Sequence, residues 1–202
     1  MQMSTQSDSI MSTVWVISLL IPILNIYALY KLIKRRNDHF HRQNLLTEDL
    51  LKFINTSAEA KGVKVELSPL ERTLREGSYE EREKSAALWA ILTLVTVLAG
   101  IYVYYFLMRD FHNHERREDS VWESISNYLS HIGVTFTLPV PLRRNFVPKR
   151  SFAIYIVLTI VTLGLFGLYW LYTLIKDPNE HFREHTIIES QLKNALTRIS
   201  ET

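Results

Sequence analysis

Three long apolar runs constrain this 202-residue chain more than any other feature of its sequence. They cover residues 14–33, 86–108 and 152–175; the last two contain no charged residue, and the first contains only Lys31. A helix of about twenty residues, rising about 1.5 Å per residue, is long enough to cross a hydrocarbon core of roughly 30 Å. The segments between the runs hold too little apolar material to enclose three buried helices. We therefore expect an all-α integral membrane protein that passes the membrane several times.

The residues around these runs exclude several classes of protein. The first thirteen residues contain no Lys or Arg and basic residues follow the first run, which favours a retained membrane segment over a cleaved signal. Because the chain has no cysteine, disulfides and thiolate metal sites are excluded. The net charge of +2 gives no reason to expect a nucleic-acid partner. The expected partners are the lipid bilayer, other membrane-protein subunits or a second copy of this chain.

The ends of the three runs align without gaps as an internal repeat. They read NIYALYKLIKRRNDHF from Asn25, GIYVYYFLMRDFHNHE from Gly100 and GLYWLYTLIKDPNEHF from Gly167. Two tyrosines, a cation and a histidine recur at aligned positions: Tyr27, Tyr102 and Tyr169; Tyr30, Tyr105 and Tyr172; Lys34, Arg109 and Lys176; and His39, His114 and His181. Beyond the histidines, mainly apolar side chains recur at helical spacing: Leu46, Leu50 and Phe53; Val121, Ile125 and Tyr128; Ile188, Leu192 and Ala195. Each copy is therefore interpreted as a membrane segment followed by an amphipathic polar helix.

This repeat sets the predicted domain boundaries. After a polar tail (1–13), repeat 1 covers 14–67, with its membrane segment at 14–33 and its polar helix at about 38–56. A charged linker (68–85) leads to repeat 2 at 86–138, with membrane segment 86–108 and polar helix at about 113–131. A Pro/Arg loop (139–150) leads to repeat 3 at 151–202, with membrane segment 152–175 and polar helix at about 178–199.

Local signals add detail to these boundaries. Asp177 and Pro178 have the chemistry of a helix start, so we expect a fresh helix there in the third copy and continuous helices in the other two. Residues 62–67 and 133–138 are short, β-branched and alternating, which predicts brief extended segments that could pair with each other.

Two groups of residues in the apolar runs have structural interpretations. Aromatic and cationic side chains near the run ends are typical of membrane-interface anchors: Tyr27, Tyr30, Lys34, Tyr102, Tyr105, Arg109, Tyr169, Trp170, Tyr172 and Lys176. Weak helix formers recur at matching depth: Pro22, Asn25, Gly100, Gly164 and Gly167. They indicate either close packing of simple spans or broken helices and hairpins that enter and leave by one face. We favour simple spans.

Sidedness depends on that choice. Three simple spans with the N-terminus outside place fifteen basic residues inside and seven outside, so the positive-inside rule favours an N-out, C-in arrangement. Hairpins would keep all twenty-two on the cytoplasmic side.

The repeated histidines raise a metal hypothesis. His39, His114 and His181 could converge into a three-imidazole site, with the secondary histidines His41, His112 and His185 nearby. However, the first two pairs are two residues apart and no acidic ligand recurs in register. We therefore favour a solvated polar face and predict no metal and no cofactor. No catalytic motif is visible, so no catalytic residue and no enzymatic activity are predicted.

The third copy resembles a family of small prokaryotic membrane proteins, domain of unknown function family 4234. The resemblance covers residues 152–185 and is carried by Gly164, Gly167, Tyr169, Trp170, Tyr172, Lys176, Asp177 and Asn179. The other copies match in degenerate form, with Ala28 and Val103 at the Trp position. The resemblance implies a prokaryotic integral membrane protein of unassigned role.

Surface helices suited to partner contact are plentiful, whereas the chemistry of a reactive site is missing. We therefore expect a non-enzymatic structural or accessory subunit of a membrane complex. The alternatives are a passive channel or carrier for a small solute, and a metal- or haem-binding membrane protein that uses the repeated histidines.

Overall fold

The chain is all-helical over residues 8–136, 138 and 146–200, the part that the computed structural model describes. In chain order the elements are the 3-10 helix η1 (Thr13–Leu20) and the α-helices α1 (Pro22–Ala60), α2 (Ser68–Glu80), α3 (Ala86–Val95), α4 (Val97–His131), α5 (Phe152–Val161) and α6 (Leu165–Ser200). The predicted all-α class is confirmed. The predicted charged linker at 68–85 contains α2.

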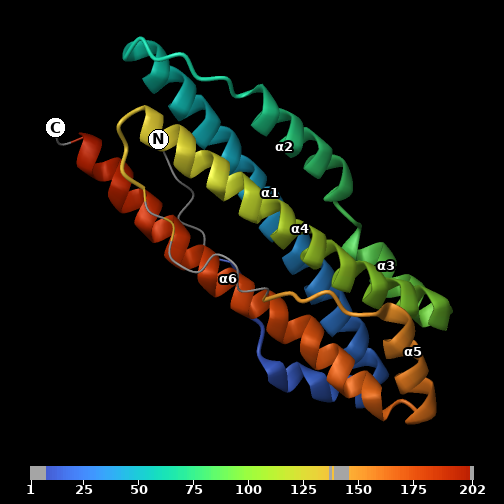
Figure 1. Cartoon of the computed structure of the whole chain (residues 1–202). Helices are drawn as coiled ribbons and strands as arrows, with labels where there is room; N and C mark the ends of the chain where they lie inside the picture. Colours follow the sequence, from blue (N-terminus) through green and yellow to red (C-terminus); the bar gives the residue numbers. More distant parts are fainter. Residues whose placement is uncertain (1–7, 137, 139–145, 201–202) are drawn as a thin grey trace.

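The three long helices α1, α4 and α6 form a parallel bundle (Figure 1). Each begins at the end of the molecule where η1, α3 and α5 lie, and each runs toward the opposite end. The short helices pack beside the starts of the long ones: η1 contacts α1 and α6, α3 contacts α1 and α4, and α5 contacts α6. Helix α2 lies along α4 and carries the chain back to the starting end.

Each predicted membrane segment is broken into a short helix and the first turns of a long one. The breaks lie at Ile21 and Thr96, which have extended backbone, and at Leu163–Gly164, where φ is 50° and 93°. Pro22 begins α1 at its first turn, where its missing N–H costs nothing. The prediction of one continuous helix per segment is therefore wrong. Among the described residues, no helix combines the length and the apolar character needed to cross a membrane.

Only two of the five weak helix formers lie at these breaks. Pro22 and Gly164 do, whereas Asn25, Gly100 and Gly167 lie inside α1, α4 and α6. A Cβ added to Gly167 would stand 3.1 Å from Leu19 Cδ2, so this glycine permits close packing of η1 on α6.

Two glycine substitutions test this assignment. Gly164→Ala is expected to destabilise the protein by about 1 kcal/mol or more, because φ of 93° is unfavourable for alanine. Gly100→Ala is expected to stabilise α4 by about 0.5–1 kcal/mol, since its added Cβ would meet nothing closer than Thr93 Cγ2 at 3.8 Å. Denaturant unfolding of both variants measures the difference, and equal effects would contradict it.

In all three copies aligned by sequence, the predicted polar helix continues the last turns of the predicted membrane segment. This confirms the continuous helices expected for the first two copies, but the fresh start predicted at Pro178 is wrong, because Pro178 lies inside α6. Proline removes the hydrogen bond to the carbonyl four residues earlier. Here that carbonyl, on Leu174, accepts a bond of 3.3 Å from Arg35 Nη2, which also donates to the Ile175 carbonyl.

The segments predicted as extended begin at the ends of α1 and α4, and their residues 63–67 and 134–136 form neither helix nor strand. Gly62 and Gly133 have φ of 66° and 78° and follow α1 and α4. In each case the N–H of the next residue bonds a carbonyl five residues earlier, Val63 to Ala58 at 2.9 Å and Val134 to Leu129 at 2.8 Å, which is the Schellman arrangement. No strand occurs among the described residues; residues 137 and 139–145, with most of the predicted Pro/Arg loop, lie outside them.

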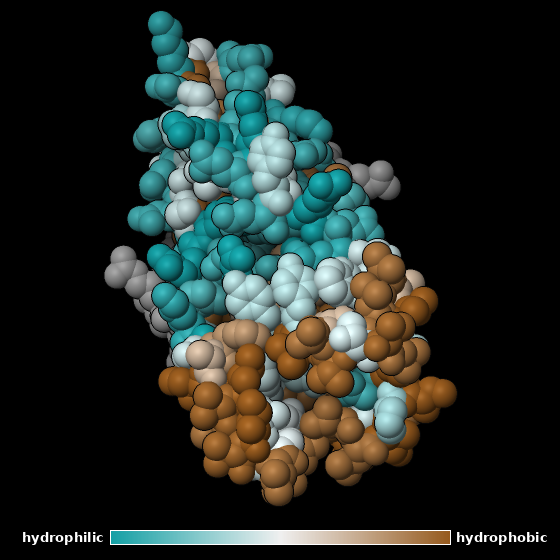
Figure 2. All heavy atoms as spheres, turned by 90° about the vertical axis from the view of Figure 1, so that its right-hand side faces the viewer, coloured by the Kyte–Doolittle hydropathy of each residue, from teal (hydrophilic) through white to brown (hydrophobic). Residues whose placement is uncertain are grey.

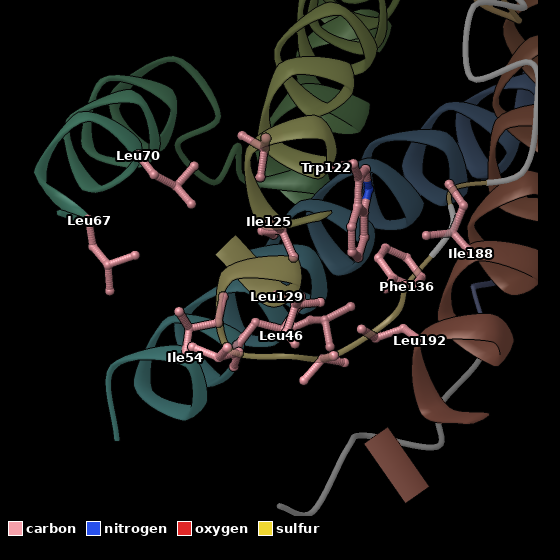
Figure 3. Close-up of a cluster of buried hydrophobic side chains, with 14 of the residues drawn as sticks. Leu46, Ile54, Leu67, Leu70, Trp122, Ile125, Leu129, Phe136, Ile188 and Leu192 are labelled. Carbon is pink, nitrogen blue, oxygen red and sulfur yellow. The ribbon is translucent and has the colours of Figure 1, made fainter. Parts of the chain in front are cut away.

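Two large apolar clusters occupy the two ends of the bundle. The far cluster joins α1, α2, α4 and α6 (Figure 3), and its centre includes Leu50, Ile125 and Leu192, each with 0% exposure. The other cluster joins the starts of the long helices, among them Ile33, Val103 and Ile175. The predicted apolar register beyond the histidines is thus part of the core. A polar layer lies between the two clusters.

Candidate metal centre

The three repeat histidines meet in this polar layer. His39 comes from α1, His114 from α4 and His181 from α6, and their ring centroids lie 5.0 to 5.6 Å apart. Their exposed fractions are 0%, 4% and 2%, so the favoured interpretation as a solvated polar face is wrong. The helices bring them together because they run parallel and in the same register.

A glutamate completes the cluster. Glu118 follows His114 by one helical turn, and its Oε2 lies 3.4 Å from His114 Nε2 and 3.4 Å from His181 Nε2. His39 Nε2 lies 3.2 Å from His181 Nε2. The four residues can each offer one ligand atom, all within 4.8 Å of one another, and all four are buried.

Three of the six distances between the four ligand atoms are close to those of tetrahedral coordination, and all six lie within 4.8 Å. With metal–nitrogen bonds of about 2.0–2.1 Å, neighbouring ligand atoms of a tetrahedral zinc site lie about 3.3–3.4 Å apart. The three distances of 3.2, 3.4 and 3.4 Å are close to that value. The cluster therefore resembles the ligand set of a zinc site, with three imidazoles and one carboxylate.

Carboxylates face the outer nitrogens of the histidines. His39 Nδ1 lies 3.0 Å from Asp8, and His114 Nδ1 lies 2.6 Å from Glu81. His181 Nδ1 lies 3.5 Å from Glu115. A carboxylate on Nδ1 fixes the tautomer that leaves the lone pair on Nε2, which is the arrangement found around metal-ligating histidines. This hydrogen bond is made by His114 Nδ1 with Glu81, whereas Nδ1 of His39 and of His181 lies near a carboxylate without forming one.

Residues one turn after the repeat histidines form a second polar level. These residues are Gln43, Glu118 and His185, and all are buried. His185 Nε2 lies 2.6 Å from Glu118 Oε2, and Gln43 Nε2 lies 2.9 Å from His185 Nδ1. His185 therefore holds Glu118 toward the centre. The sequence prediction missed Glu118, although its i,i+4 spacing from His114 is a usable signal.

Burial sets the protonation of the cluster. It lowers the pKa of His39 well below its usual value, an effect that His114, His185 and His181 reinforce, and it also lowers the pKa of His181. Burial brings the pKa of His185 to about 3 and raises that of Glu118. For His114 burial acts in the same direction, but Glu118 and Glu81 outweigh it and raise the pKa. Neutral imidazoles are the form that binds a metal.

Two arginines hold the outer carboxylates. Arg42 pairs with Asp8 and, at 2.7 Å, with Glu189. Arg117 pairs with Glu81 and Glu80. Glu115 accepts backbone N–H bonds of 3.0 Å from Phe146 and Val147. The acidic groups around the histidines are therefore fixed in place.

The other predicted site residues lie away from this layer. His41 is exposed, and His112 contacts the Val147 carbonyl at 2.8 Å. Among the predicted anchors, Trp170 is buried with 4% exposure, so a role at the surface is wrong for it. Tyr30, Tyr105 and Tyr172 are half-buried, whereas the remaining anchors are exposed: Tyr27, Lys34, Tyr102, Arg109, Tyr169 and Lys176.

The acidic and amide residues of the family pattern have structural partners. Asp177 pairs with Arg150. Asn179 binds both backbone groups of Met11, which lies before η1. Its Oδ1 accepts from Met11 N at 3.1 Å, and its Nδ2 donates to Met11 O at 2.8 Å. Arg35 Nη1 also donates to Asn179 Oδ1 at 2.7 Å. Asn179 thus links α1, α6 and the segment that carries Asp8 toward His39.

Comparison with curated proteins found no match, and comparison with solved structures found none either. One family model matches a segment that begins just before α5 and covers most of α6, with His181 and His185 inside it. Residues 150–196 match the family described as Domain of unknown function (DUF4234), which confirms the resemblance of the third copy.

Proposed function

We propose that this protein binds one zinc ion at His39, His114, His181 and Glu118, and that the ion joins the three long helices. The observation that carries this proposal is the convergence of three Nε2 atoms and one carboxylate oxygen within 4.8 Å in a buried layer, with three of their distances near the tetrahedral value. It favours the metal-binding alternative over the accessory-subunit and channel interpretations, which stay predictions.

The charge balance of the layer supports a bound cation. Asp8, Glu81, Glu115 and Glu118 have side-chain exposures of 5%, 7%, 5% and 10%. Asp8 and Glu81 pair with Arg42 and Arg117, whereas Glu115 accepts backbone N–H bonds and Glu118 faces His185. Burial lowers the pKa values of His39, His181 and His185, so these imidazoles supply little positive charge to the centre. Buried carboxylates require paired positive charge, and a divalent cation at the centre would supply it.

The donor set favours a transition metal and a structural role. Magnesium and calcium prefer oxygen ligands, whereas imidazole suits zinc, copper, iron and nickel. Zinc sites with four protein ligands are structural, since catalytic sites keep one position open for water or substrate. A site with three histidines and Glu118 has its four ligands, which favours a structural role for the ion.

Metal content tests the proposal. The full chain, purified in mild detergent and reloaded with zinc, is expected to retain about one ion per chain after gel filtration, as measured by mass spectrometry of the metal. His114→Ala is expected to lower the retained zinc at least tenfold by removing one of the four ligands. His41→Ala is the matched control, because this histidine is exposed and lies outside the cluster.

Cobalt loading provides a second readout of the same site. Co²⁺ in a tetrahedral site absorbs visible light strongly, so the loaded protein should be coloured and His114→Ala should not. Two results would overturn the proposal. One is equal zinc retention by His114→Ala and His41→Ala, and the other is no zinc retention by the parent chain.

A further inference from the structure

Each short helix and the start of the long helix after it form a hairpin (η1–α1, α3–α4 and α5–α6), and the end of the bundle that carries these hairpins has an apolar surface. Figure 2 shows this end covered by apolar residues, whereas polar residues cover the rest of the visible face. The most exposed apolar side chains lie at the three breaks: Leu20 and Ile23 are 69% and 74% exposed, Val97 and Leu98 79% and 74%, and Leu163 and Leu165 94% and 71%. Each hairpin tip therefore presents large apolar side chains outward. A continuous apolar surface of this kind marks a binding or membrane-contact site.

We propose that this apolar end inserts into a single leaflet of a phospholipid bilayer, with all three hairpins entering and leaving by the same face. The inference concerns the membrane contact and does not depend on the metal site.

The length of the hairpins fits half a bilayer. Helices α3 and α5 have 10 residues each, which corresponds to about 15 Å at about 1.5 Å per residue. The 3-10 helix η1 has 8 residues, or about 16 Å at about 2 Å per residue. A complete hydrocarbon core is roughly 30 Å thick. All three hairpins therefore reach about the middle of a bilayer.

Backbone N–H groups at the hairpin tips are hydrogen-bonded within the chain, which is required in a hydrocarbon environment. At the first tip Ile21 N donates to Ser18 O at 3.0 Å, and at the second Thr96 N donates to Leu92 O at 3.0 Å. At the third, Gly164 N donates to Thr159 O at 2.7 Å, and Phe166 N donates to the Thr162 hydroxyl at 2.9 Å. The chain thus reverses direction without depending on water at these donors.

Residues suited to headgroups surround the bundle at one level. Each long helix exposes a tyrosine to nearly the same degree, at 47%, 45% and 49% for Tyr27, Tyr102 and Tyr169. Two turns further along, each helix exposes a cation, namely Lys34, Arg109 and Lys176. Tyrosines settle at the headgroup level, and cations beyond them meet lipid phosphates. This charge pattern selects an anionic lipid surface, because a second copy docked end to end would bring six such cations close together.

Single-leaflet insertion fixes the sidedness of the whole chain. Because α1, α4 and α6 run parallel, their far ends lie on one side of the membrane. The repeat histidines follow the cations by five residues, or about 8 Å along the helix. The polar layer therefore lies just outside the headgroups.

The experiment introduces one cysteine at a time into the full chain, which has none of its own. The variants Leu98→Cys, Ser57→Cys and Ser130→Cys are each reconstituted in vesicles of phosphatidylcholine and phosphatidylglycerol. A fluorophore on Leu98→Cys is expected to be quenched most by lipids brominated near the end of the acyl chain. A fluorophore on Tyr79→Cys, whose parent side chain on α2 is 78% exposed, is the control and should not be quenched. A membrane-impermeant maleimide should label Ser57→Cys and Ser130→Cys to the same extent in intact vesicles.

Opposite labelling of Ser57→Cys and Ser130→Cys would overturn the proposal, because it requires the chain to cross the membrane between them. Absence of quenching at Leu98→Cys would also overturn it. So would purification of Leu98→Cys without detergent as a dimer cross-linked through this cysteine, which would show that a second copy covers the apolar end. Loss of zinc binding with normal quenching would contradict the metal site alone.

Discussion

Chelation of the proposed zinc ion is expected to lower the melting temperature of this protein by about 10 °C. An ion present at about 1,000 times its dissociation constant stabilises the folded state by about 4 kcal/mol. For a chain of this size each kcal/mol corresponds to about 2–4 °C. The physical reason is that His39, His114 and His181 come from three different helices, so the ion joins elements that separate on unfolding. Differential scanning fluorimetry with and without chelator measures the shift.

Glu118→Gln distinguishes coordination from packing in this experiment. Glutamine has nearly the shape of glutamate but is a weaker metal ligand, and it leaves His185 Nε2 facing an amide instead of a carboxylate. We expect most of the chelator-dependent shift to disappear in Glu118→Gln and to persist in His41→Ala. If zinc-loaded parent protein melted at the same temperature with and without chelator, the ion would have no structural role.

The register of the three copies could be predicted from the sequence, and it places the right side chains at the same level. Leu50, Ile125 and Leu192 occupy aligned positions and all reach 0% exposure in the core. The same alignment places His39, His114 and His181 together, but only if the helices are parallel. Three simple spans would alternate in direction and put His114 on the other side of the membrane from His39. The sequence could not predict the proposed metal centre, because simple spans were favoured over hairpins.

The choice between a simple span and a hairpin depends on the three helix breaks, and the sequence does not mark all three equally clearly. Pro22 and Gly164 mark two of them, because proline begins a helix readily and glycine accepts φ of 93°. The break at Thr96 has no such residue: its side chain accepts a bond from Leu98 N at 3.3 Å and caps α4. Apolar periodicity cannot reveal such a break, because both sides of it are equally apolar. Pro178 is the reverse case, since a proline that predicts a helix start lies inside α6 with Arg35 bonded to the freed carbonyl.

Replacement of Arg36 is expected to destabilise the protein strongly. The side chain of Arg36 has 0% exposure, and its Nη2 lies 2.8 Å from Asp110 Oδ2. Its Nη1 donates to Asn37 at 2.9 Å and to the Arg82 carbonyl at 3.0 Å, which ties α1 to the segment between α2 and α3. Burial lowers the pKa of Arg36, while Asp110 opposes this. Removing one partner of such a buried pair costs about 3–5 kcal/mol, because the remaining carboxylate loses its main partner.

Lys34→Ala is the matched control for Arg36→Ala, since both cations lie on α1 and pair with an aspartate. Lys34 contacts Asp38 at 2.6 Å, but the two side chains are 55% and 60% exposed. An exposed pair of this kind contributes about 0.2–1 kcal/mol, because water solvates both groups after the change. Unfolding in urea should thus separate the two variants by about 2–4 kcal/mol. Asp110 also contacts Lys84 at 2.8 Å, so a difference below about 1 kcal/mol would mean that Lys84 alone can neutralise this carboxylate.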